Sequence, residues 1–202
     1  MSGHERADWE ARWDRALETH GERLAERPPN AWLTSEVADL PAGRALDAGC
    51  GHGAEALWLA ARGWTVTAVD FSAAALAHAR ATADGRGLAV DWVEADLGTW
   101  VPPAAAYDLV VCLYVHVAGD VGAFVDRIAT GVAPGGTLLL VGHRPVDPRT
   151  GAATAAASQT QVSVADAEAA LGPLGGELVV AEERPRALDE SGVDAVIRWR
   201  KR

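Results

Sequence analysis

Three glycines at alternate positions, Gly49, Gly51 and Gly53, follow directly on the apolar segment 44–48. Glycine has no Cβ and accepts positive φ, so such a turn lets a ligand approach the main chain and the start of the next helix. The next apolar run ends on Asp70, whose two carboxylate oxygens are able to accept hydrogen bonds from paired ribose hydroxyls. The spacing therefore predicts a unit that binds a nucleoside.

Strands and helices are expected to alternate around this turn. Apolar residues at helical spacing predict helices over 5–27, 31–40, 53–62, 72–82, 120–130 and 164–171. Apolar and β-branched runs predict strands over 44–48, 65–69, 88–94, 107–112, 137–142, 177–183 and 193–200. This alternation requires parallel crossovers and a sheet covered on both faces, which is an α/β fold. The last two strands predict an antiparallel hairpin, and the weakly patterned segment 144–162 is interpreted as a mobile loop or lid.

Length and composition limit the class of protein and of partner. With 202 residues, 49% of them hydrophobic, the chain is able to build one domain around one core. The net charge of −10 disfavours nucleic acid as a partner. The two cysteines, Cys50 and Cys112, form neither a disulfide framework nor a metal-ligand cluster, and each is interpreted as a small buried residue or a reactive thiol. No run approaches the ~20 apolar residues of a membrane span, so we expect a cytoplasmic protein that binds no membrane.

A family resemblance is carried by five segments: LDAGCGHG, VDFS, EADL, YDLVVCLYVH and APGGTLLLVGH. In this order they resemble the class I methyltransferases that use S-adenosylmethionine (SAM), over roughly Trp32 to the C-terminus. The part ahead of the first strand, with Trp9, Trp13 and PPNAWL, is more narrowly similar to small bacterial methyltransferases of the tellurite-resistance and thiopurine-methyltransferase type.

The resemblance implies both an architecture and a reaction. The implied fold is Rossmann-like, a three-layer α/β/α arrangement with a mostly parallel seven-stranded sheet and the C-terminal antiparallel hairpin. It is a single domain over 1–202, with 1–41 as a helical cap over the active site and 42–202 as the SAM-binding core. The implied enzyme moves a methyl group from SAM to a small-molecule acceptor, leaves S-adenosylhomocysteine (SAH), holds no metal ion and is a monomer or homodimer.

Particular residues are implied to hold the cofactor. Asp47 lies where a carboxylate offsets the positive side of SAM, Asp70 where it meets the ribose, and Asp96 where it accepts from the adenine amine. Phe71 is implied to flank the adenine edge. The full implied set is Asp47, Gly49, Cys50, Gly51, Gly53, Asp70, Phe71, Ser72, Ala95, Asp96, Leu97 and Cys112.

The acceptor side is less specified by the sequence. Tyr114 and His116 follow the strand 107–112, where the family places residues around the transferring methyl, and both are implied to be catalytic. His116 is interpreted either as a general base or as a polar loop histidine, and Tyr114 as a residue that orients the substrate or lines the pocket. His143 and Arg144, which follow the strand 137–142, are interpreted as holding an anionic group of the substrate.

The tryptophans ahead of the core leave two interpretations open. Trp9 and Trp13 are able to form an aromatic cover that binds the substrate, and packing on a helix face is the alternative.

Two other functions compete with methyl transfer. Gly49, Gly51 and Ala54 formally satisfy the pattern G-x-G-x-x-G/A, and Asp70 fits the ribose-binding acid, so an NAD-dependent oxidoreductase is one alternative. A noncatalytic SAM-binding protein is the other, because residues that bind a cofactor do not prove turnover.

Overall fold

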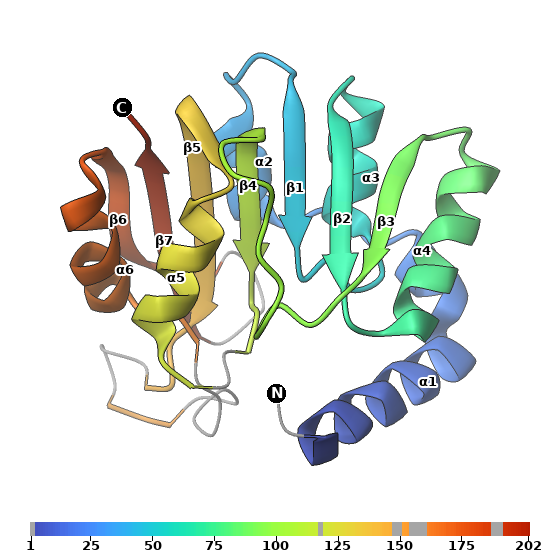
Figure 1. Ribbon diagram of the computed structural model, residues 1–202. Helices are drawn as coiled ribbons and strands as arrows, with labels where there is room; N and C mark the ends of the chain where they lie inside the picture. The colour runs from blue at the N-terminus through green and yellow to red at the C-terminus, as the bar shows by residue number, and fades with distance from the viewer. Residues whose placement is uncertain (1–2, 117–118, 147–150, 154–160, 187–191) are drawn as a thin grey trace. The chain divides into compact units, whose positions relative to one another are not determined.

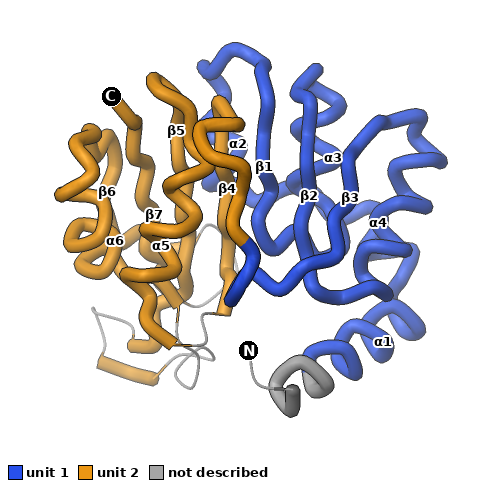
Figure 2. The backbone as a smooth tube through the Cα atoms, viewed as in Figure 1, with its two compact units in different colours: residues 1–100 blue, residues 101–202 orange. Residues whose placement is uncertain are grey.

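The computed structural model describes residues 3–116, 119–146, 151–153, 161–186 and 192–202 (Figure 1). They fall into two compact units, 1–100 and 101–202 (Figure 2). Each unit combines strands with helices that pack on them.

The first unit is built on three parallel strands in the order β3-β2-β1. Their bounds are β1 Arg44–Ala48, β2 Thr65–Asp70 and β3 Val90–Glu94. The connecting helices, α3 (Ala54–Ala61) and α4 (Ala73–Gly85), pack on these strands. Because the strands are parallel, their carboxyl ends, and the loops that leave them, gather at one edge of the sheet.

Two further helices precede β1 in this unit. The N-terminal helix α1 (Gly3–Ala25) is kinked at His20 and packs against α4. The short helix α2 (Ala31–Val37) starts at Asn30, whose side chain accepts a hydrogen bond from the Trp32 backbone at 2.8 Å.

The second unit has four strands in the order β4-β5-β7-β6. Their bounds are β4 Tyr107–Leu113, β5 Val132–His143, β6 Glu177–Pro185 and β7 Val193–Arg200. Strands β4 and β5 are parallel, whereas β7 runs antiparallel to both of its neighbours, β5 and β6. Helix α5 (Val121–Ala129) packs on β5 and on α6 (Val164–Leu171), and α6 continues into the turn η1 (Gly172–Leu174).

The expected fold class is confirmed: seven strands form a mostly parallel α/β sheet that ends in an antiparallel hairpin. The largest difference in a strand boundary is at β5, which begins at Val132 rather than at Thr137, whereas the bounds of β3, β4 and β6 differ by one or two residues. The Pro-Gly-Gly segment expected before the strand lies inside it, since Gly136 lets the backbone pass close to β4. A Cβ at Gly136 would lie 3.0 Å from the Asp108 carbonyl oxygen.

Other expectations fall partly outside the described residues. The loop or lid expected over 144–162 includes 147–150 and 154–160, which are not described; its described part pairs Val146 with Ala153. The single domain over 1–202, with its cap at 1–41, stays a prediction.

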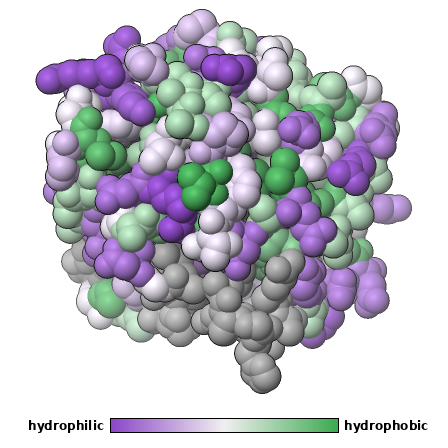
Figure 3. Space-filling view, viewed as in Figure 1, coloured by the Kyte–Doolittle hydropathy of each residue, from purple (hydrophilic) through white to green (hydrophobic). Residues whose placement is uncertain are grey.

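The described surface is mixed in character. Hydrophilic and hydrophobic residues are interspersed over the face seen in Figure 3. Among the described helices, none has the length and apolar composition needed to cross a lipid bilayer.

Candidate functional site

The glycine turn lies at the carboxyl end of β1. Backbone N–H groups of Gly49 and Cys50 donate to the Val69 carbonyl at 2.8 and 3.1 Å, which ties the turn to the end of β2. The φ values of Gly49, Gly51 and Gly53 are 86°, 50° and 84°. These values lie in the region that side chains disfavour, so the positive φ expected for this turn is confirmed.

Asp70 holds this turn and the start of α4 together. Its Oδ2 accepts a hydrogen bond from the Gly51 backbone N–H at 2.8 Å, and its Oδ1 accepts one from the Ser72 backbone N–H at 2.9 Å. Each carboxylate oxygen has a second lone pair, which leaves capacity to accept from a ligand hydroxyl. The Ser72 side chain caps α4 by accepting from Ala75 N–H at 3.2 Å, and it donates to Glu10 of α1 at 2.8 Å.

Asp47, next to the turn, has a buried carboxylate oxygen without a partner. It is 2% exposed, and its Oδ2 has no hydrogen-bond partner among the described residues. Burial raises the pKa of Asp47 well above its usual value, and the nearby carboxylates of Glu55 and Asp70 raise it further. A buried carboxylate oxygen without a partner is costly, so this position favours a cationic ligand group.

Asp47, Glu55 and Asp70 together form what we call the acidic cluster. Burial raises the pKa of Glu55 and of Asp70 as well, although backbone hydrogen bonds lower both in part. Within the described part of the chain, no group of three His, Cys, Asp or Glu side chains is arranged to hold a metal ion.

The N-terminal helix places one of its two candidate tryptophans on the glycine turn. A Cβ built on Gly51 would lie 2.8 Å from Trp13 Cζ2. The Trp13 and His52 rings have centroids 5.9 Å apart, and burial lowers the pKa of His52 to about 4. Trp9 is half-buried, with the Arg12 guanidinium 4.7 Å from its ring centre. The role of Trp9 and Trp13 in binding a substrate stays a prediction.

The loop that comes after β3 is hydrogen-bonded to the end of β2. The Ala95 backbone N–H donates to the Asp70 carbonyl at 2.9 Å, and Asp96 Oδ1 accepts from the Gly98 N–H at 2.7 Å. Leu97 is buried and Phe71 is half-buried. The first unit thus contains every residue of the implied cofactor set except Cys112, a buried residue of β4. Their contacts with a cofactor stay predictions.

A second polar cluster lies in the second unit, around Asp194 of β7. Tyr114 donates its hydroxyl to Asp194 Oδ2 at 2.8 Å, His143 Nδ1 lies 2.9 Å from Asp194 Oδ1, and Arg186 Nε donates to the same oxygen at 2.9 Å. We call these four residues the Asp194 cluster. Two of its members, Tyr114 and His143, were predicted as site residues; Asp194 and Arg186 were missed. The sequence contains one signal for Asp194, because it is an acid in the otherwise apolar segment 193–197.

Two other residues, Arg144 and His116, were predicted to act on the acceptor side. Arg144 forms an ion pair with Glu183, with Nε 2.7 Å from Oε1. His116 is half-buried and follows β4. Their roles in the reaction stay predictions.

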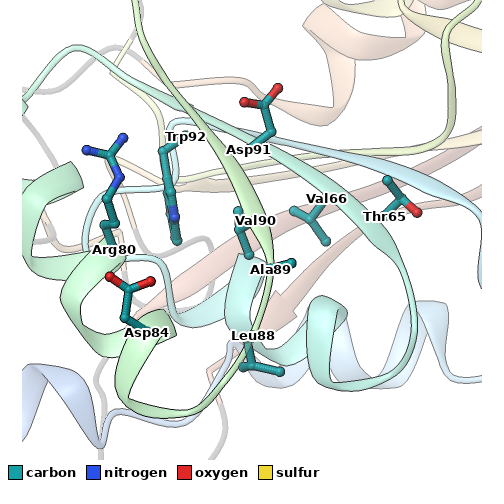
Figure 4. A pocket seen from close by; sticks show the side chains of 9 residues that line it. All are labelled: Thr65, Val66, Arg80, Asp84, Leu88, Ala89, Val90, Asp91 and Trp92. Carbon is teal, nitrogen blue, oxygen red and sulfur yellow. The ribbon is translucent and has the colours of Figure 1, made fainter.

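A pocket of about 420 Å³ lies at the amino ends of β2 and β3 (Figure 4). Arg80 and Asp84 of α4 stand on one side of it beside Trp92, and the Asp91 carboxylate points away from them. None of the predicted site residues lines this pocket.

Known proteins resemble the chain in sequence and in fold. A family model described as a methyltransferase domain matches residues 45–136. Probable thiol methyltransferase 2 of Arabidopsis thaliana is 28% identical over 207 residues, which cover 100% of this chain and 88% of that protein. The chain spans about half the length of several other curated relatives that it matches.

Two of the solved structures that share the fold show the extent of the likeness. TehB from Haemophilus influenzae has a TM-score of 0.70 at 16% identity, covering 86% of this chain and 63% of TehB. Magnesium protoporphyrin IX methyltransferase from Synechocystis, with bound SAM, has a TM-score of 0.62 at 20% identity, covering 93% of this chain and 80% of that one.

Proposed function

Since this chain belongs to the class I methyltransferases that use SAM, we propose that it transfers the SAM methyl group to the sulfur of a small thiol. The proposal takes the family and the use of a small-molecule acceptor as given. What we propose is the acceptor atom and the role of each residue.

The observation that carries the proposal is the unpartnered Oδ2 of buried Asp47 inside the acidic cluster. SAM supplies an electrophilic methyl group on a sulfonium, and it also carries an ammonium group. The Asp47 carboxylate would accept from that ammonium, and the free lone pairs of Asp70 would accept from the ribose hydroxyls. Gly51 has a positive φ and no side chain, and the Trp13 ring occupies the place that its Cβ would take, so Trp13 would line the turn beside the ligand.

The choice of sulfur rests on the likeness to a probable thiol methyltransferase along the whole of this chain. Displacement at a sulfonium methyl disperses charge, so alignment of the reacting atoms supplies much of the acceleration. A thiolate is a strong nucleophile for such a displacement and is accessible near neutral pH, because an ordinary thiol has a pKa of about 8.5.

Two further parts of the proposal concern partners and location. The net charge of −10 supports a small acceptor over a nucleic acid. The two cysteines are both free, which supports the reducing cytoplasm as the location. We propose a monomer or homodimer as the working form.

The test joins calorimetry with turnover. SAM and SAH are titrated into the protein, with NADH as the competing ligand, and SAH formation is then measured with 2-mercaptoethanol, cysteine and hydrosulfide. We expect SAM and SAH to bind, NADH not to bind, and SAH to form only when a thiol is present. Binding of SAM without turnover of any of these thiols would overturn the choice of acceptor, and binding of NADH alone would overturn the cofactor.

A further inference from the structure

Apolar side chains make up most of the lining of the pocket at the amino ends of β2 and β3. Val66, Leu88 and Val90 lie along it beside the Trp92 indole (Figure 4). Val66 is buried, and the other three side chains are half-buried. The pocket volume of about 420 Å³ lies in the range of small-molecule sites, about 300–1,000 Å³, which are lined mainly by apolar and aromatic side chains. This lining favours a ligand with an apolar group.

Two opposite charges stand next to this apolar lining. Arg80 and Asp84 are four residues apart on α4, so they lie on one face of the helix, about 6 Å apart along its axis. Figure 4 shows both side chains on the same side of the pocket, beside Trp92. With the residues that the structure describes, neither side chain forms an ion pair or a hydrogen bond. Both charges are therefore available to a ligand.

The charges beside the pocket select a zwitterion. Asp91 also lines the pocket, but its carboxylate points away from Arg80 and Asp84 (Figure 4). One cation and one anion then face the ligand, so a lone ammonium would be repelled by Arg80 and a lone carboxylate by Asp84. An α-amino acid carries an ammonium and a carboxylate on the same carbon, so it makes both attractions at once. Its side chain would supply the apolar group.

The Trp92 indole extends from this pocket to the glycine turn. A Cβ built on Gly53 would lie 2.8 Å from Trp92 Cη2 and 3.2 Å from Trp92 Cζ3, so the indole packs directly against the Gly53 main chain. Gly53 has a φ of 84° and is the N-cap of α3. The pocket and the turn both belong to the first unit. One side chain thus contacts both the pocket and the expected cofactor cradle.

We propose that this pocket is a second ligand site, which binds an α-amino acid with an apolar side chain and strengthens SAM binding through Trp92. The carboxylate of the amino acid pairs with Arg80, its ammonium pairs with Asp84, and its side chain packs on the indole. Binding of the amino acid is independent of the proposed function, whereas the effect on SAM rests on it.

The effect on SAM follows from the packing of the indole. A ligand in the pocket adds contacts to the Trp92 ring, whose Cη2 edge lies against Gly53. These contacts favour the ring position that supports the glycine turn, so they raise the population of the turn conformation that receives the cofactor. Coupling between two sites is reciprocal, so SAM must strengthen binding of the amino acid by the same factor.

The first experiment compares four compounds. L-phenylalanine carries all three groups, phenethylamine lacks the carboxylate, 3-phenylpropionate lacks the ammonium, and glycine lacks the apolar side chain. Each compound is titrated by calorimetry into the whole protein, with and without saturating SAH. Because Arg80 and Asp84 are exposed, we expect the three incomplete compounds to bind at least about threefold more weakly than L-phenylalanine. The site is overturned if L-phenylalanine does not bind, or if phenethylamine or 3-phenylpropionate binds equally well.

Two variants test which side chain meets which charge. Arg80→Gln should remove the preference for L-phenylalanine over phenethylamine, and Asp84→Asn should remove the preference over 3-phenylpropionate. Asp91→Asn is the matched control and should keep both preferences, because its carboxylate points away from the other two side chains (Figure 4). All three residues are exposed, so each variant should fold. If both preferences survive in Arg80→Gln and Asp84→Asn, the amino acid binds elsewhere and the site is overturned.

The effect on the cofactor is measured by titrating SAH with and without saturating L-phenylalanine. We expect SAH to bind at least about fivefold more tightly when L-phenylalanine is present, which is the lower end of typical coupling between sites. Trp92→Phe has a shorter side chain that should not reach Gly53. We therefore expect this variant to bind both compounds and to lose the coupling between them.

The remaining outcomes separate this inference from the proposed function. Weaker SAH binding in the presence of L-phenylalanine would show that the amino acid occupies the cofactor site, and it would overturn the second site. Unchanged SAH affinity would overturn the coupling. If SAH itself does not bind, the proposed function fails, and the comparison of the four compounds still decides whether the pocket binds an amino acid.

Discussion

The indole of Trp13 lies against the α-carbon of Gly51, where a Cβ would come within 2.8 Å of Trp13 Cζ2. The glycine turn of the first unit is thus both the expected cofactor cradle and the surface that receives α1. Close packing on one side and ligand approach to the same main chain both require the absence of a side chain at this position.

Gly51→Ala should therefore destabilise the protein and weaken SAM binding. Two costs add: the alanine must adopt a φ of 50°, and its methyl group must push Trp13 away. Gly63→Ala is the matched control, because Gly63 has a φ of 85° but nothing within 4 Å of the added carbon. Each variant bears about 1–2 kcal/mol for the left-handed backbone, and only Gly51→Ala bears the contact.

Denaturant unfolding and calorimetry with SAM check this pair. The Gly51 variant should lose about 1–3 kcal/mol more stability than the Gly63 variant, the usual range for overpacking, and it alone should bind SAM more weakly. Equal losses of stability in the two variants would mean that the contact between Trp13 and residue 51 does not contribute to stability.

Asp47→Asn should make the free protein more stable and its SAM binding weaker. The substitution removes a buried charge that has no partner at Oδ2, and also the repulsion with Glu55 and Asp70. A gain of about 1 kcal/mol would raise Tm by ~2–4 °C in a protein of this size. Losing a hydrogen bond to a charged group, worth about 1.5–3 kcal/mol, would weaken SAM roughly 10- to 100-fold.

Asp39→Asn, at an exposed position just after α2, serves as the control and should change neither quantity. Lower stability together with unchanged SAM affinity would show that Asp47 has a purely structural role.

The stability gain of Asp47→Asn should also vanish on acidification. Because the pKa of Asp47 is raised in the folded protein, its charge destabilises the fold above that pKa, and this cost is lost as pH falls from there toward the ordinary pKa of an aspartate.

The sequence predicted the first unit closely and the second less so. The glycine spacing, the apolar strand ends and the cap at Ser72 are local signals, and β1 has the predicted bounds. The Asp194 cluster is different, because its four residues come from the ends of β4, β5, β6 and β7 and meet only where these strands pair. No spacing along the chain encodes that contact. The start of β5 was missed for a related reason, since proline and glycine usually end a strand, whereas here Gly136 lets the strand pass close to β4.

SAM affinity should depend on pH in a direction set by the acidic cluster. The pKa values of Asp47 and Asp70 are both raised, chiefly by burial. A cationic ligand favours the ionised carboxylates, so binding releases protons wherever these groups are partly protonated. Affinity should therefore fall as pH is lowered through the raised pKa range of these carboxylates, and it should level off above that range.

Calorimetry in two buffers of different ionisation enthalpy measures the protons released on binding. Asp47→Asn should flatten the pH dependence and reduce the release, whereas the Asp39→Asn control should keep both. Proton uptake in place of release would contradict the placement of the SAM cation beside Asp47.

Asp70→Ala should weaken SAM binding and lower stability together. The carboxylate accepts from the Gly51 and Ser72 backbone N–H groups, so its removal leaves two buried donors without their acceptor, at about 1–3 kcal/mol each. Denaturant unfolding measures that loss.

The ligand contribution is isolated by comparing SAH with an analogue that lacks the ribose hydroxyls. If Asp70 binds the ribose, the unaltered protein should prefer SAH, by ~2 kcal/mol for paired hydrogen bonds to a charged group, and the variant should bind the two ligands alike. A preference that survives in the variant would place the ribose elsewhere and leave Asp70 as the residue that ties the glycine turn to α4.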